Sequence, residues 1–152
     1  MIRGIPVLSL TKKDKPISYI ESHAGRGLYD LRAEEAVKTG EAAQGIERAE
    51  NWFDQDHPYR RALRAIQNRF GDTAYPGSPL FAQTLLRETD TLHLAELHPQ
   101  EFAALRLNMR SRNTHVYQQD GFALAQSLKR RADRDFDGRL DRIAPTAGAA
   151  GV

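Results

Sequence analysis

The apolar positions of this chain of 152 residues alternate between short runs rich in β-branched residues and longer stretches with helical spacing. The short runs predict strands at residues 17–22, 91–97 and 115–119. Apolar residues three or four positions apart predict helices at residues 59–70, 80–87, 100–109 and 122–129. Strands separated by helices indicate an α/β fold with a parallel sheet.

The first two predicted strands lie too far apart in the sequence for one crossover helix. Residues 30–87 therefore predict a helical insertion, beginning with a helix at about residues 34–51 that Gly40 and Gly45 weaken. Residues 75–79 contain two prolines around a Gly-Ser pair, which predicts a turn.

The composition fits one ordinary globular domain, with 40% hydrophobic and 28% charged residues. No apolar run approaches the roughly 18 residues that a membrane span needs. Pro6 interrupts the short apolar patch at the start, so we expect no signal peptide. The absence of cysteine excludes disulfides and thiolate metal sites, and it fits a cytoplasmic protein.

A net charge of +2 is too small to indicate a nucleic-acid partner, but the basic residues are clustered. Solvated helix faces are the simpler interpretation of each cluster. The clusters comprise Arg60, Arg61, Arg64 and Arg69; Arg106, Arg110 and Arg112; and Lys129, Arg130 and Arg131. Arg60, Arg61 and Arg64 are the better candidates for RNA contacts. We expect Trp52-Phe53 to anchor the packing of the insertion rather than to stack on bases.

Polar groups follow each of the three predicted strands. The first strand runs into Ser22-His23 and a turn with Gly25 and Gly27, the second ends at Glu96, and the third at Asp120-Gly121. Ligands of parallel α/β sheets lie across the carboxyl ends of the strands, and glycines let backbone amides come close to them. A carboxylate at such a strand end could accept hydrogen bonds from ribose hydroxyls. An Asp-Gly pair could accept a hydrogen bond from the exocyclic amine of a purine and leave room for its ring.

Each carboxylate also has a purely structural interpretation. Glu96 could cap the helix that begins at Pro99, and Asp120 could be the N-cap of the helix from Phe122.

Several segments resemble the RlmJ-type adenine-N6 methyltransferases of large-subunit ribosomal RNA. They occur in that family's order and at roughly its spacing, over about residues 11–128. The segments are Lys13 to Leu31, Lys38-Thr39-Gly40-Glu41, Tyr75 to Leu80, Glu96-Leu97-His98-Pro99 and Asp120-Gly121-Phe122. The resemblance implies a Rossmann-like methyltransferase sheet with a helical insertion.

The resemblance also implies the reaction and the cofactor. A methyl group would pass from S-adenosylmethionine to N6 of an adenine in 23S ribosomal RNA. Carried over position by position, the cofactor contacts would fall on His23, Ser78, Glu96, Asp120 and Gly121.

The chain departs from the family pattern at both ends. The Asp-Pro-Pro-Tyr type motif expected about twenty residues beyond Asp120-Gly121 is missing, because Asp141 is followed by Arg142-Ile143-Ala144. The amino-terminal His-Ala-Gly-Asn type loop is missing too. We therefore expect a divergent stub at residues 1–12, a partial methyltransferase domain at 13–128 and a disordered tail at 129–152. The catalytic residue stays unassigned, and we expect a fragment of marginal stability whose own activity the missing motif leaves open.

The tail offers an alternative chemistry. Its acidic residues have the spacing of an EF-hand calcium loop, with Asp133, Asp135, Asp137, Gly138 and Asp141 in matching positions. The position of the bidentate Glu is Ala144, and Pro145 breaks any exiting helix. The alternative function is therefore a non-catalytic RNA-binding or calcium-binding module, and no other metal site is expected.

Overall fold

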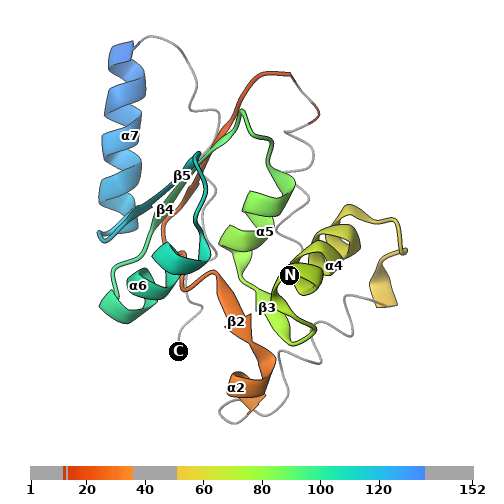
Figure 1. Cartoon of the computed structure of the whole chain (residues 1–152). Coiled ribbons are helices and arrows are strands. Elements are labelled where there is room, and N and C mark those ends of the chain that lie inside the picture. The colour runs from red at the N-terminus through yellow and green to blue at the C-terminus, as the bar shows by residue number, and fades with distance from the viewer. Residues whose placement is uncertain (1–11, 13, 36–50, 136–152) are drawn as a thin grey trace.

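A parallel three-stranded sheet forms the centre of the computed structural model, which describes residues 12, 14–35 and 51–135 (Figure 1). Its strands are β1 (Ser18–Glu21), β4 (Thr91–Ala95) and β5 (Thr114–Tyr117), in the order β1-β4-β5. Ser18 pairs with Thr91, and Leu92 pairs with Thr114. The predicted strands and the α/β class are confirmed, and the parallel sheet with its helices is Rossmann-like.

Helices cover both faces of this sheet (Figure 1). On one face, Leu92 and Leu94 pack against α5 (Ser78–Leu85) and α6 (Pro99–Asn108). On the other face, Ile20 and Ala95 pack against Leu124 and Leu128 of α7 (Gly121–Asp135). Because successive side chains of a strand point to opposite faces, an apolar run of a few residues supplies both cores.

A two-stranded ribbon that the sequence did not predict joins the chain before the insertion to its later part. Strands β2 (Leu28–Asp30) and β3 (Ala74–Pro76) pair antiparallel, flanked by α2 (Leu31–Glu35) and α4 (Pro58–Phe70). The turn predicted at residues 75–79 is wrong, because Pro76 ends β3 and Ser78 already begins α5. Pro79 is compatible with this helix since it lies in the first turn, where its missing N–H is not needed. The helix predicted at residues 34–51 lies mostly outside the described residues.

Helix α4 follows its prediction closely. His57 is its N-cap, with Nδ1 accepting the Tyr59 N–H at 3.2 Å. Gly71 ends it at a φ of 102°, a conformation that favours glycine.

Helix α7 is longer than predicted, because it continues through residues 129–135, which were expected to belong to the tail. The apolar pattern stops at Leu128, but Lys, Arg and Ala are strong helix formers and carry the helix further. Residues 136–152, the rest of the expected disordered tail, lie outside the described residues.

Asp90 holds the amino ends of all three strands together. Its buried carboxylate accepts the Ile17 N–H at 3.0 Å and the Arg87 guanidinium at 2.8 Å, while its carbonyl accepts the Asn113 amide at 2.6 Å. Burial alone would raise the pKa of Asp90. The hydrogen bonds from the Arg87 side chain and from the backbone N–H groups of Ile17 and Arg87 outweigh it and lower the pKa.

No helix in the described part of the chain is both long and apolar enough to cross a bilayer.

Candidate functional site

The three predicted strand ends meet at the carboxyl edge of the sheet. The Gly25 N–H donates to Oε2 of Glu96 at 2.8 Å, and the Ala24 N–H donates to the Ala95 carbonyl at 3.0 Å. Gly121 packs so closely on the chain after β1 that a Cβ there would overlap the backbone of Ser22. The loops after β1, β4 and β5 therefore form one continuous surface.

The loop after β1 is the glycine turn that the sequence predicts. Gly25 and Gly27 have φ values of 64° and 76°, in the left-handed region. A Cβ on Gly27 would also come within 3.1 Å of Met109 and 3.2 Å of Leu105. The Gly27 carbonyl accepts the Gly77 N–H at 2.8 Å, which connects this loop to the start of α5.

Glu96 has the structural role that was considered for it, together with a second one. Its Oε1 accepts the His98 N–H at 2.8 Å next to the start of α6, while Oε2 accepts Gly25. A carboxylate oxygen has two acceptor positions, so each oxygen of this half-buried side chain can accept one further hydrogen bond.

Asp120 is the N-cap of α7, as its structural interpretation predicts. Its Oδ1 accepts the N–H groups of Phe122 at 3.1 Å and Ala123 at 3.0 Å. Both bonds use Oδ1, so Oδ2 of this exposed side chain remains available to a ligand. The side chains of Leu97 and Phe122, next to the two carboxylates, are 64% and 69% exposed.

Ser78 reaches the same edge through a residue that the sequence analysis missed. Its hydroxyl donates to the buried carboxylate of Glu21, which also accepts the Tyr19 hydroxyl at 3.0 Å. Glu21 is the last residue of β1, and the signal that could have found it is an acidic residue inside an otherwise apolar strand.

His23 lies on the outer side of the loop. It is exposed, its Nδ1 is 2.9 Å from the Ser22 hydroxyl, and its ring meets the Phe122 ring edge-on at 6.4 Å. His23, Ser78, Glu96, Asp120 and Gly121 are thus all placed around the carboxyl edge, and their contact with a cofactor stays a prediction.

The basic residues of the insertion separate into two kinds. Arg60 is half-buried and its Nη1 donates to the Phe53 carbonyl at 3.2 Å, so it stabilises the fold. Arg61 and Arg64 are exposed on α4. The packing-anchor prediction is confirmed for Phe53, which stacks on His57 at 4.1 Å, and is wrong for Trp52, which is 75% exposed.

The calcium alternative falls mainly outside the described residues. Asp133 and Asp135 belong to α7, and the rest of the loop, from Asp137 onward, is not described. Among described side chains, no group of three or more His, Cys, Asp or Glu residues could hold a metal ion.

Comparison with known proteins identifies the family. The family model "Ribosomal RNA large subunit methyltransferase D, RlmJ" matches residues 14–136. Ribosomal RNA large subunit methyltransferase J of Escherichia coli (strain K12) is 41% identical over 135 residues, covering 84% of this chain and 46% of that protein. The protein of the same name from Haemophilus influenzae is 36% identical over 119 residues, covering 75% of this chain and 42% of the relative.

A solved structure agrees with these matches. A crystal structure of a Legionella pneumophila protein superposes with a TM-score of 0.60 at 32% identity, covering 80% of this chain and 46% of that one. The chain spans about half the length of the curated relatives it matches. It belongs to the family of RlmJ-type ribosomal RNA large subunit methyltransferases.

Proposed function

We propose that the carboxyl edge of the sheet binds S-adenosylmethionine for methylation of N6 of an adenine in 23S ribosomal RNA. The observation that carries the proposal is the hydrogen bond from Gly25 to Glu96, which joins the glycine loop to the carboxylate of the next strand. Because ribosomal RNA is the proposed substrate, we place this activity in the cytoplasm.

The edge has groups that suit each part of the cofactor. Glu96 retains acceptor positions for ribose hydroxyls, and Oδ2 of Asp120 can accept from an exocyclic amine. Leu97 and Phe122 expose apolar surface beside these carboxylates, where a purine ring would lie. Two carboxylates also favour a nearby sulfonium cation electrostatically.

Gly121 lets α7 pack directly on the loop after β1, and Gly25 lets that loop adopt its turn, so the two halves of the proposed site are held together. A side chain on Gly121 would overlap Ser22, and Gly25 adopts a conformation that larger residues rarely take. His23 and Ser78 flank this backbone, Ser78 through its hydrogen bond to Glu21.

S-adenosylmethionine supplies a methyl group on a positively charged sulfur. The acceptor nitrogen is a poor nucleophile, because its lone pair is delocalised into the adenine ring. The base must therefore leave its stack and be held in line with the methyl group. The chain's contribution on the described residues is to bind and orient the methyl donor, and the group that bonds the target amine stays unassigned.

A titration with S-adenosylhomocysteine tests this proposal. We expect saturable binding by the chain, weakened about tenfold or more in Glu96→Gln because a charged acceptor of two hydrogen bonds is lost. Glu88→Gln is the matched control, since Glu88 is an exposed glutamate that precedes β4 at the opposite, amino end of the sheet. Equal affinities of both variants and the unaltered chain would contradict the proposal.

RNA binding without methyl transfer is the second candidate function. It is favoured by α4, which has four arginines and no carboxylate in its 13 residues. If exposed Arg61 and Arg64 contact phosphates, affinity for RNA should fall steeply with salt concentration. An affinity that does not change with salt would exclude this role.

A further inference from the structure

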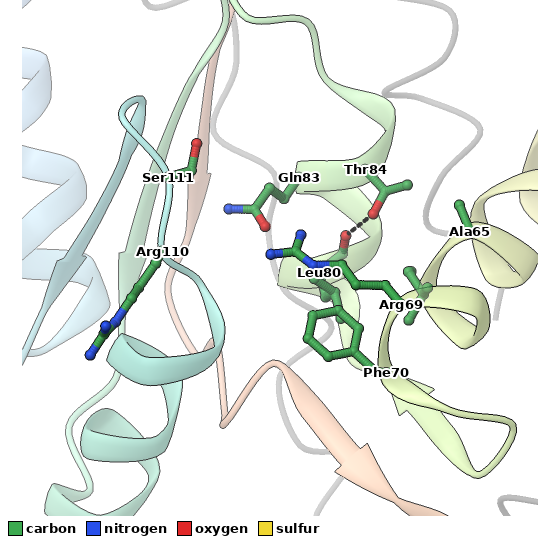
Figure 2. A pocket seen from close by; sticks show the side chains of 9 residues that line it. Ala65, Arg69, Phe70, Leu80, Gln83, Thr84, Arg110 and Ser111 are labelled. Carbon is green, nitrogen blue, oxygen red and sulfur yellow. Dashed lines mark hydrogen bonds between the residues drawn. The ribbon is translucent and has the colours of Figure 1, made fainter.

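A pocket of about 330 Å³ lies between α4, α5 and the chain that leads from α6 to β5 (Figure 2). It brings together two of the arginine clusters, which are about forty residues apart in sequence. The residues that line it are Ala65, Ile66, Arg69, Phe70, Leu80, Gln83, Thr84, Arg110 and Ser111.

The walls combine an apolar base with a cation and an aromatic ring. Ile66 and Leu80 are buried, whereas Phe70 is 37% exposed. The guanidinium carbon of Arg69 is 4.9 Å from the centre of the Phe70 ring. Figure 2 shows Arg69 extending toward Gln83, while Arg110 directs its guanidinium away from them.

Two polar side chains of the pocket retain acceptor positions, and none of the described residues that line it is a carboxylate. Gln83 donates its amide to the Thr114 hydroxyl at 3.0 Å, so its Oε1 can still accept. The Thr84 hydroxyl donates to the Leu80 carbonyl at 2.8 Å, which leaves its lone pairs free to accept. An aromatic face, an arginine, an amide acceptor and a hydroxyl acceptor together suit a nucleobase with its phosphate.

The pocket does not belong to the candidate cofactor site. Arg110 and Ser111 precede β5, and Thr114, the partner of Gln83, is the first residue of that strand. The cofactor site lies at the other end of the same strand. Because β5 has four residues at roughly 3.3 Å each, the two ends of the strand are about 13 Å apart.

We propose that this pocket holds an unpaired base of single-stranded RNA against Phe70, with Arg69 on the adjoining phosphate. The inference rests on the proposed function, in which RNA is the substrate. Charge complementarity supports it, because α4 carries Arg61 and Arg64 on its exposed surface and no carboxylate. The volume lies near the lower end of the range for ligand pockets, which fits one base and excludes a folded peptide.

The test measures the affinity of the full chain for a fluorescent single-stranded RNA of about ten nucleotides by anisotropy. We expect Phe70→Leu to weaken binding about tenfold, since stacking on an aromatic ring is lost. Arg69→Gln should weaken binding and reduce the slope of log affinity against log salt by about one. The control is Arg106→Gln, because Arg106 covers Phe102 on α6 at 5.7 Å in the same kind of pair outside the pocket.

The same variants are titrated with S-adenosylhomocysteine and unfolded thermally. The inference is supported if the pocket variants bind RNA more weakly than the unaltered chain but keep its affinity for S-adenosylhomocysteine and its melting temperature. The RNA pocket is refuted if the pocket variants bind RNA as tightly as the unaltered chain, or if Arg106→Gln weakens RNA binding equally. In either case the proposed function stands as long as S-adenosylhomocysteine still binds. No binding of S-adenosylhomocysteine, with RNA binding still dependent on Phe70, refutes the cofactor proposal and keeps the RNA pocket.

Discussion

Replacing Gly121 by alanine should separate the two halves of the candidate cofactor site. An added Cβ would lie under 3.0 Å from Ser22, against atoms that include its backbone. Carbon atoms pack at roughly 3.5–4.0 Å, so α7 and the loop after β1 must move apart by about 1 Å or more. Overpacking of this kind costs about 1–3 kcal/mol, and the better helix propensity of alanine offsets at most about 1 kcal/mol.

The expected result is a loss of about 1–2 kcal/mol in the free energy of unfolding, measured by urea denaturation, and a tenfold or larger loss of affinity for S-adenosylhomocysteine. Gly71→Ala is the control. Gly71 has open space for a Cβ but a φ of 102°, so alanine there costs about 1–2 kcal/mol through backbone strain alone. It should lower stability and leave affinity unchanged. A Gly121→Ala chain with the stability and affinity of the unaltered chain would refute the packing argument.

Three further predictions concern buried polar groups. Asp90→Asn should cost about 2–3 kcal/mol in urea denaturation, because a charged acceptor of several hydrogen bonds is lost. Since the pKa of Asp90 is lowered in the folded chain, this difference should be present above the ordinary aspartate pKa and vanish as pH falls through the lowered value. Ser78→Ala should lower the free energy of unfolding by about 1–3 kcal/mol, because it removes a donor from the buried Glu21. The control is Ser127→Ala, since the Ser127 hydroxyl bonds only the Leu124 carbonyl among the hydrogen bonds described; an equal or smaller cost for Ser78→Ala would count against the prediction. Burial and the positive charges of His115 and Arg131 lower the pKa of His93 to about 4. The free energy of unfolding should therefore fall as the pH drops from 6.5 to 4, by up to about 1.4 kcal/mol per pH unit. His93→Gln should flatten this dependence on pH, and an unchanged slope would contradict the prediction.

The strand ends were predictable because short segments that contain buried apolar residues stand out between the helical segments. Ile20, Leu92 and Leu94 belong to such segments, and the polar residues that follow them then fall at one edge of a parallel sheet. The ribbon of β2 and β3 was not predictable, because strands of three residues are too short to show a period.

Long-range partners explain the rest of what the sequence concealed. The buried Glu21 accepts a hydrogen bond from Ser78, which is 57 residues away in the sequence. Arg69 and Arg110 line one pocket because the fold brings α4 and α5 close to the chain that leads from α6 to β5. Trp52 and Phe53 are adjacent aromatic residues, yet among the described residues only Phe53 meets other rings, those of His57 and Tyr59.

The most direct test of the cofactor site is a calorimetric titration of the chain with S-adenosylhomocysteine, comparing Asp120→Ser with the unaltered protein. Serine keeps an N-cap oxygen for α7 but removes the Oδ2 acceptor, so the fold is retained while the ligand contact is lost. We predict saturable binding by the unaltered chain and at least a tenfold weaker affinity in Asp120→Ser, with equal melting temperatures. No binding by the unaltered chain, or equal affinities in both proteins, would contradict a cofactor site at this edge of the sheet.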